Sequence, residues 1–238
     1  MKVQLFATCL VDWFRPEIGI ATVQLLERAG VKVIFPEAQT CCGQIAFNVG
    51  RWEEARMVAE QWVRTFSPEL PVVSPSGSCV AMVRHNYRML FEGHPLYSRW
   101  EALAARTYEL SQFLVDVLGI EDLGIRRNGV VTCHISCHTQ RMLGVRKAPE
   151  RLIQATGAEY RPLPEANVCC GFGGLFSLHF PEISGAMLVR KIQAIQSTGA
   201  EVVLAPDWSC LMHISGGLHR MGLPIRALHL AEWLMEGE

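Results

Sequence analysis

The sequence predicts an α/β fold of two pseudo-symmetric, Rossmann-like β/α halves with parallel sheets, each carrying one copy of a cysteine motif. Eight of the nine cysteines fall into two copies of the pattern C-x31-CCG-x(35–38)-C. Each motif cysteine or cysteine pair also follows a short strand-like run and precedes a helix-like segment. A repeated strand–cysteine–helix order indicates repeated β/α units, whose strands are parallel.

The two copies align at nearly constant offsets. An offset of 128 residues superposes the first three cysteines and the glycine of each copy, and an offset of 131 superposes the last cysteine. The first copy contains Cys9, Cys41, Cys42, Gly43 and Cys79, and the second contains Cys137, Cys169, Cys170, Gly171 and Cys210. The polar connector over 121–128 separates them, so we predict halves of residues 1–127 and 128–238.

In the first half, strands are expected over 2–8, 31–35 and 71–74, because these runs are apolar or alternate apolar with polar residues. Pro16 suits the first turn of a helix that Gly30 ends. Further helices are expected from 52 to about 66 and after Cys79. Residues 91–128 read as helical, with an amphipathic helix over 107–118.

The pattern then restarts in the second half. Strands are expected over 129–132 and 202–204, and an extended segment over 159–163. A helix over 148–156 ends at Gly157, and a longer one runs from Pro181 to about 196 before Gly199. A last helix opens near Cys210.

Composition narrows the possible functions. Half of the 238 residues are hydrophobic and the formal net charge is −1, which does not favour binding to nucleic acid or to an anionic membrane surface. No run of about 18 apolar residues predicts a membrane span. Asp12 and Arg15 interrupt the apolar start, which argues against a signal peptide. We therefore expect a cytoplasmic protein, where unpaired cysteines more often serve metal binding or catalysis than disulfides.

The motif cysteines are expected to converge, because β–α junctions of a parallel sheet meet at the carboxyl ends of the strands. Four thiolates in each half suit an iron–sulfur cluster or zinc, since soft sulfur does not favour magnesium or calcium. Structural zinc sites usually take ligands from short C-x2–4-C knuckles, which this chain lacks. Gly43 and Gly171 would let the backbone approach the bound group. The spacing favours clusters and leaves zinc open, including zinc in one half only.

Other residues near the motifs have less specific patterns. Cys133 lies outside the repeat and reads as a core residue. His134 and His138 flank Cys137 and are candidates for ligation, for proton transfer or only for hydrogen bonding; one of them could act as the catalytic base of an oxidation. His213, three residues after Cys210, is a candidate metal ligand on the same helical face.

These motifs resemble the cysteine-rich CCG domain found in heterodisulfide reductase, in the glycolate oxidase iron–sulfur subunit and in lactate utilization protein A. The opening FATCLVD and the segments PEAQTCCGQ, HISCH and CCGFGG are most similar to the lactate utilization protein A family, over nearly the whole chain. This resemblance implies a cytoplasmic iron–sulfur subunit of a multi-subunit oxidoreductase that converts L-lactate to pyruvate. It also implies two partners, a ferredoxin-type iron–sulfur subunit and a third small subunit.

The chain departs from the fuller CCG motif, which ends in C-x-x-C. The last position is Met82 in the first half and His213 in the second. Four cysteines per half are enough for one [4Fe–4S] cluster, whereas the type and number of clusters stay open. Three alternatives remain: a zinc-bound structural or assembly module, a subunit of a related glycolate or disulfide oxidoreductase, and a thiol–disulfide enzyme using a vicinal cysteine pair.

Overall fold

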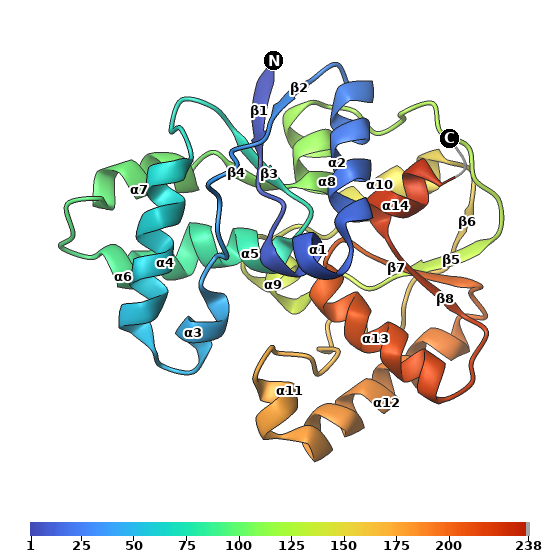
Figure 1. The fold of residues 1–238 in the computed structure, drawn as a ribbon. Helices are drawn as coiled ribbons and strands as arrows, with labels where there is room; N and C mark the ends of the chain where they lie inside the picture. Colours follow the sequence, from blue (N-terminus) through green and yellow to red (C-terminus); the bar gives the residue numbers. More distant parts are fainter. Residues whose placement is uncertain (237–238) are drawn as a thin grey trace.

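Each half contains a four-stranded parallel sheet with the same strand order, as seen in a computed structural model that describes residues 1–236 (Figure 1). The first sheet has the order β2-β1-β3-β4 and the second β6-β5-β7-β8. The first-half strands are β1 (Lys2–Leu5), β2 (Lys32–Ile34), β3 (Val72–Ser74) and β4 (Thr107–Glu109). The second-half strands are β5 (Val130–Cys133), β6 (Glu159–Tyr160), β7 (Val202–Ala205) and β8 (Arg226–His229). The predicted fold class is confirmed.

The register is equivalent in the two sheets. Leu5 at the end of β1 pairs with Val73 on β3, and Cys133 at the end of β5 pairs with Leu204 on β7. The strand order reverses between the two central strands of each sheet, which are β1 and β3 in the first half and β5 and β7 in the second. In open parallel sheets, ligands usually bind at the carboxyl ends of the strands at such a point. In both halves the single cysteine of the motif follows one of these central strands.

Helices of the first half are α1 (Cys9–Phe14), α2 (Pro16–Arg28), α3 (Gln44–Asn48), α4 (Trp52–Thr65), α5 (Gly77–Ala81), the π-helical η1 (Met82–Asn86), α6 (Tyr87–Phe91), α7 (Tyr97–Ala104), α8 (Leu110–Gln112) and the π-helical η2 (Phe113–Val117). Those of the second half are α9 (Cys137–Arg141), α10 (Ala148–Ala155), α11 (Phe176–His179), α12 (Pro181–Ser197), α13 (Trp208–Arg220) and α14 (Leu230–Met235).

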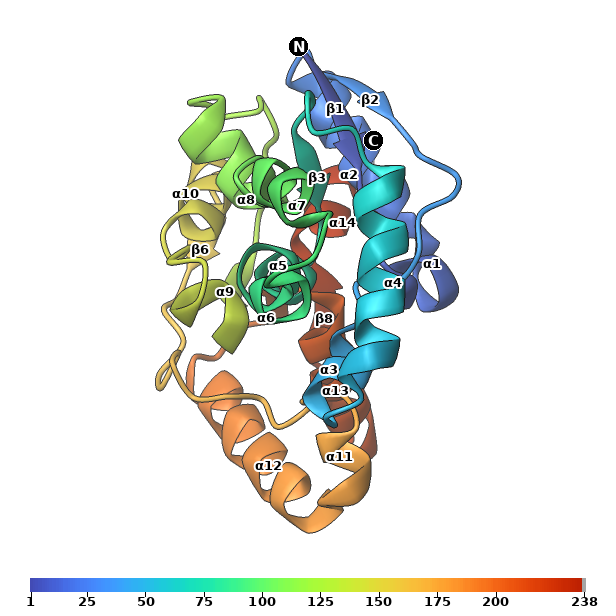
Figure 2. The ribbon, with the colours of Figure 1, turned by 90° about the vertical axis from the view of Figure 1, so that its left-hand side faces the viewer.

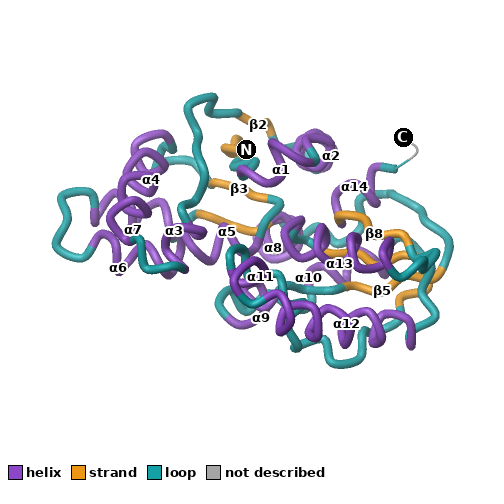
Figure 3. Tube along the Cα trace, turned by 60° about the horizontal axis from the view of Figure 1, so that its bottom comes forward, coloured by secondary structure: helices purple, strands orange, loops and turns teal. Residues whose placement is uncertain are grey.

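The helices form three layers around the two sheets. Helices α2, α8, α10 and α14 lie between the sheets, where α2 packs on α14 and α8 on α10 (Figures 1 and 2). One apolar cluster joins them across the halves and contains buried residues such as Leu25, Phe113, Ile153 and Trp233. Helices α4, α6 and α7 cover the outer face of the first sheet, and α12 and α13 that of the second (Figure 3). The two halves therefore share their central core.

The fourth strand of each half is a correction to the sequence prediction. The expected amphipathic helix over 107–118 begins instead with the strand Thr107–Glu109, and Arg226–His229 forms the matching strand of the second half. Each of these strands has only three or four residues and is followed at once by a helix, α8 or α14. The alternation of apolar and polar residues therefore does not show in the sequence. Pairing of β4 with β3 and of β8 with β7 at the sheet edges overrides the local helical pattern of these residues.

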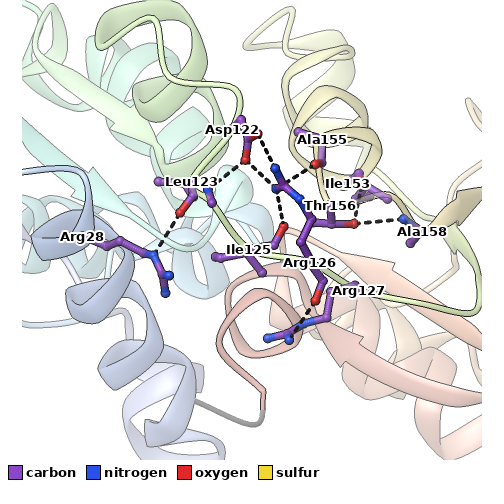
Figure 4. Close-up of polar contacts among 11 residues, drawn as sticks. Arg28, Asp122, Leu123, Ile125, Arg126, Arg127, Ile153, Ala155, Thr156 and Ala158 are labelled. Carbon is purple, nitrogen blue, oxygen red and sulfur yellow. Dashed lines mark hydrogen bonds and ion pairs between the residues drawn. The ribbon is translucent and has the colours of Figure 1, made fainter.

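The polar connector between the halves is held by many hydrogen bonds (Figure 4). Arg126 contacts both carboxylate oxygens of Asp122, at 2.9 and 3.0 Å, and its neighbour Arg127 donates its backbone N–H to Thr156 O at 3.0 Å. Arg28 Nε donates to Leu123 O at 2.9 Å from α2. The connector is thus attached to helices of both halves, and the division at residues 127 and 128 stays a prediction. Within residues 1–236, no helix is long and apolar enough to cross a membrane.

Glu109 caps α8 at the centre of this shared core and is fully buried. One carboxylate oxygen accepts hydrogen bonds from Ser111 Oγ and, at 3.0 Å, from Gln112 N; the other has no partner within the described residues. Burial raises the pKa of this carboxyl to about 7. The folded protein therefore keeps a proton on Glu109 at pH values where the unfolded chain has lost it.

We predict that Glu109→Gln stabilises the protein at neutral and alkaline pH. The native-state pKa lies above the unfolded value, so the wild-type contribution of Glu109 is lost as pH rises from about 4.5 to 7. The amide can still accept both hydrogen bonds without ionising. The variant should be more stable by about 2 kcal/mol at pH 8, with a much smaller difference at pH 4.5, as measured by denaturant unfolding. A difference that does not change with pH would contradict this account.

Candidate metal centres in a cleft between the two halves

The four motif cysteines of the first half gather at the carboxyl edge of its sheet. Cys9 begins α1 four residues after β1 ends, Cys41 and Cys42 lie in the loop after β2, and Cys79 lies in α5 after β3. Cys9 Sγ is 3.4 Å from Cys41 Sγ, and Cys42 Sγ is 3.4 Å from Cys79 Sγ. Three separate parts of the sequence therefore place four sulfurs at one point.

The second half repeats this arrangement. Cys137 begins α9, Cys169 and Cys170 lie in the loop before α11, and Cys210 lies in the first turn of α13. Interaction with Cys169 raises the pKa of the Cys137 thiol, and interactions with Cys169 and Cys210 raise that of Cys170. All eight motif cysteines are free thiols, half-buried or buried, and the pairing of neighbours is the same in both groups.

One sulfur in each group is stabilised as a thiolate. Hydrogen bonds from Cys42 and Cys9 hold the pKa of Cys41 far below its usual range, and hydrogen bonds from Cys137 and Cys170 do the same for Cys169. The donating thiols have raised pKa values, because they share those hydrogen bonds and are desolvated. Thiolate is the form that binds metals, so each group is already polarised towards ligation.

The glycine of each CCG segment allows the backbone to turn around the sulfurs. Gly43 has φ +78° and Gly171 has φ +94°, a region that residues with a Cβ rarely adopt. Their backbone N–H groups donate to Cys41 Sγ and Cys169 Sγ, each at 3.4 Å. A Cβ on Gly171 would lie 2.6 Å from Ser184 O, so the second loop is held close to α12.

Both cysteine groups face one cleft between the halves, with a cavity volume of about 120 Å³. The cleft lies where α1, α5, α9 and α13 meet, with α1 beside α13 and α5 beside α9 (Figure 1). Its wall includes members of both groups, among them Cys42, Cys79, Cys170 and Cys210, together with Phe172 and Trp208. The two groups therefore form one site with two centres, which the sequence repeat did not predict.

Contacts across the halves fix the floor of this cleft. Asp207 caps α13 and accepts a hydrogen bond from Ser78 N of the first half at 2.8 Å, next to an antiparallel bridge between Ser76 and Asp207. His229 Nε2 lies 3.0 Å from Pro75 O. The Asp207 and His229 side chains are fully buried, so these bonds are shielded from water and hold the two cysteine groups in a fixed relation.

His138 lines the cleft and connects the two groups. Its Nδ1 lies 3.6 Å from Cys137 Sγ, and its Nε2 lies 3.3 Å from Gln44 Nε2 of the first half. The Gln44 amide can only donate at that nitrogen, so Nε2 is the acceptor and Nδ1 carries the proton. Gln44 follows the first CCG segment directly and was not identified from the sequence; its position after that segment was the available signal.

His134 is placed quite differently, behind the second cysteine group. Its side chain is 1% exposed, and neither ring nitrogen has a hydrogen-bond partner among the described residues. Desolvation, followed by the nearby charge of Lys191, lowers its pKa to about 3, so the ring is neutral. Leaving a buried polar group unpaired costs about 1–3 kcal/mol. His134 lies outside the residues that line the cleft.

The remaining candidates also have defined places. His213 Nε2 lies 3.3 Å from Ser184 Oγ and its ring lies against Phe172, in a shallow groove beside α12. Its role as a metal ligand stays a prediction. Cys133 is buried at the end of β5 within the shared apolar core. Lys191, buried on α12, donates to Glu165 O at 3.0 Å and was not identified from the sequence.

The donor set fits a metal centre or an iron–sulfur cluster in each half. Four soft thiols converge in each group, one of them already favours the thiolate form, and backbone N–H groups point at the sulfurs. In the second group, the donor atoms of His134, Cys170 and Cys210 lie within 4.8 Å of one another. A metal ion bound at this place would also satisfy the unpaired buried imidazole.

Comparison with known proteins agrees with this architecture. A family model described as a cysteine-rich domain, CCG, matches residues 3–84 and 131–215. Lactate utilization protein A of Geobacillus kaustophilus (strain HTA426) is 51% identical over 98% of this chain and 98% of its own length. Lactate utilization protein A of Bacillus subtilis (strain 168) is 46% identical over 98% of this chain and 99% of its own. Lactate utilization protein A of Halalkalibacterium halodurans is 46% identical over 100% of this chain and 98% of its own length.

We predict that Gly171→Ala disrupts the second centre selectively. Its Cβ would clash with Ser184 O and would add strain at φ +94°, with an expected loss of about 2–4 kcal/mol in stability. Gly50→Ala is the matched control, because Gly50 has φ +79° but no atom within 4 Å of an added Cβ, and should cost about 1 kcal/mol. Denaturant unfolding and metal content measure the two effects. Equal losses in both variants would show that the close approach does not matter.

Proposed function

The chain belongs to the CCG cysteine-rich domain family and, within it, to the lactate utilization protein A family; from this membership we propose that it is an iron–sulfur subunit of an oxidoreductase that converts L-lactate to pyruvate. The observation that carries the proposal is the single cleft faced by two groups of four thiols. Thiolates at this density suit iron–sulfur clusters, and two redox centres beside one cavity suit the oxidation of a small substrate.

We propose that Cys9, Cys41, Cys42 and Cys79 hold one cluster and that Cys137, Cys169, Cys170 and Cys210 hold the other. Clusters of the [4Fe–4S] type supply one-electron acceptors when bound, and oxidation of lactate to pyruvate releases two electrons and two protons. Four thiols in each half match the ligand number of such a cluster. Zinc in one or both halves is the competing occupant, and it would give a structural module without redox activity.

Within the cleft, His138 is the residue we propose as the base that accepts the lactate hydroxyl proton. Its Nε2 is an acceptor whose hydrogen-bond partner among residues 1–236 is the Gln44 amide, at 3.3 Å, and a substrate hydroxyl could take the place of that amide. The Nδ1–H group directed at Cys137 Sγ fixes the tautomer. His134, the other histidine considered for this role, is supported less well, because it is buried outside the cleft lining.

Electrons must leave for a partner, because the sequence lacks a ferredoxin-type C-x2-C-x2-C run. We propose a ferredoxin-type iron–sulfur subunit and a third small subunit as partners, with a cytoplasmic location. A groove beside the first centre supports a docking site for the ferredoxin-type partner. It is lined by Cys9 and Cys41, and by Trp13 and Phe14, which are 79% and 59% exposed. Exposed aromatic side chains at a redox centre are typical of such a contact.

Metal analysis tests the cofactor proposal. Anaerobically purified or reconstituted protein should contain about eight irons per chain with matching sulfide, and an EPR signal after dithionite reduction. Cys42→Ser/Cys79→Ser and Cys170→Ser/Cys210→Ser should each lower the iron content by about half, because each removes ligands of one centre. Cys133→Ser should leave it unchanged, since Cys133 lies in the apolar core. Stoichiometric zinc that resists replacement by iron would overturn the proposal.

Turnover in the presence of both partners tests the reaction. His138→Gln should lower kcat for L-lactate oxidation by about 100-fold or more with iron content retained, because general base catalysis typically contributes that much. Trp13→Ser/Phe14→Ser should instead raise the concentration of the ferredoxin-type partner needed for half-maximal turnover by about 10-fold.

Met57→Ser provides the surface control for the docking pair, because Met57 is exposed on α4 and lines neither the cleft nor the groove. It should change neither kcat nor the partner concentration. Full activity of the His138→Gln complex would remove His138 from the reaction, and an unchanged partner requirement in the Trp13/Phe14 variant would move the docking site elsewhere.

A further inference from the structure

The two cysteine groups differ at one position beside the sulfurs. Phe6 and His134 are related by the offset of 128 residues and occupy the same place in their sheets, one residue beyond the strand. Phe6 N donates to Val73 O at 2.9 Å, and His134 N donates to Leu204 O at 2.7 Å. The backbones are equivalent, so the difference between the halves lies in the side chain.

In the first half this position is purely structural. The Phe6 ring makes edge-on contacts with Trp62 and Phe66, at centroid distances of 5.6 and 5.7 Å, and is fully buried. The side chain completes the outer core behind the cysteines and offers no donor atom. Four thiols are therefore the donor set of the first centre.

In the second half the same position holds an imidazole that is aimed at the sulfurs. Both ring nitrogens of His134 are buried without a partner among the described residues, and the donor atoms of His134, Cys170 and Cys210 all lie within 4.8 Å of one another. Ligand atoms around one tetrahedral metal ion lie about 2.0–2.3 Å from it and are therefore about 3.3–3.8 Å apart. A small adjustment therefore brings the imidazole within reach of the metal centre that these thiols would hold.

We propose that His134 is a nitrogen ligand of the second centre, which makes the two centres chemically different. The inference rests on the proposed iron–sulfur function. It gives the second half five candidate donors for the four irons of a [4Fe–4S] cluster, so the imidazole takes the place of one thiolate there, whereas the first half has four thiols and no nitrogen donor. Replacing thiolate by imidazole ligation raises the reduction potential of an iron–sulfur centre. The second centre is therefore the one that is reduced first.

His138 contacts Cys137 Sγ from the cleft through its Nδ1, and His213, a further histidine of this half, is less suited to ligation. Its Nε2 lies 3.3 Å from Ser184 Oγ, and it lines the separate groove beside α12. Buried Lys191 adds a second difference between the halves, because the same offset places Val63 at its position in α4. A nearby cation also favours the reduced, more negative centre, and it adds no donor to the set.

Pulsed EPR of the intact, iron-loaded protein tests the ligation. Protein labelled with ¹⁵N-histidine and reduced with dithionite should show a strongly coupled nitrogen, as expected for imidazole bound directly to iron. His134→Phe, which copies the first half, should lose this coupling. His213→Gln and His94→Gln should retain it, since His213 is a rival donor, and His94 pairs with Glu60 and lines neither the cleft nor the groove beside the first centre.

A second variant distinguishes loss of the nitrogen ligand from loss of the whole second centre. His134→Cys supplies a thiolate, so it should keep both centres loaded with iron, lose the nitrogen coupling and lower the reduction potential of the second centre. Wild-type protein with about eight irons and no strongly coupled nitrogen, or a coupling that persists in His134→Cys, overturns the assignment and leaves the proposed function intact. Wild-type protein that never takes up iron overturns both.

Discussion

The fold depends most on the parallel pairing of strands within each half. Parallel strands bring every β–α junction to the same edge of a sheet, so Cys9, Cys41, Cys42 and Cys79 meet although they are far apart in sequence. The same constraint places short helix starts and backbone N–H groups beside the sulfurs, where they favour thiolate. Folding of the two sheets therefore also brings the cysteines of each group together.

A second level of organisation comes from the core between the sheets. Helices α2, α8, α10 and α14 are buried between the halves, and polar contacts such as Asp207 with Ser78 N join the cleft floor. The centres are consequently held at a fixed separation and open onto one cavity. For the proposed function, a rigid pair of centres would need little rearrangement when charge moves and would hold a small substrate in a fixed place.

Sequence reasoning recovered what is local and repeated. The order strand–cysteine–helix predicted both parallel sheets and the convergence of each cysteine group, because each link spans only a few residues. The strand Thr107–Glu109 was not predicted, since three residues carry too little periodicity to outweigh the helix that follows. The shared cleft was also not predictable, because it depends on how the inner helices pack. The contrast between Phe6 and His134 was visible in the repeat, but its meaning required the unpaired imidazole nitrogens.

The near-twofold arrangement of the halves bears on the ancestry of the chain. A half-length ancestor with a single sheet would have left the apolar faces equivalent to α2 and α8 open to water, and pairing of two identical copies would have covered them. Such a homodimer would have carried two identical centres facing one cavity. Joining the copies into one chain would have released them from this symmetry, so that the equivalent positions 6 and 134 could hold phenylalanine in one half and histidine in the other. Covalent linkage thus turned a symmetric pair of sites into two that can evolve separate tasks.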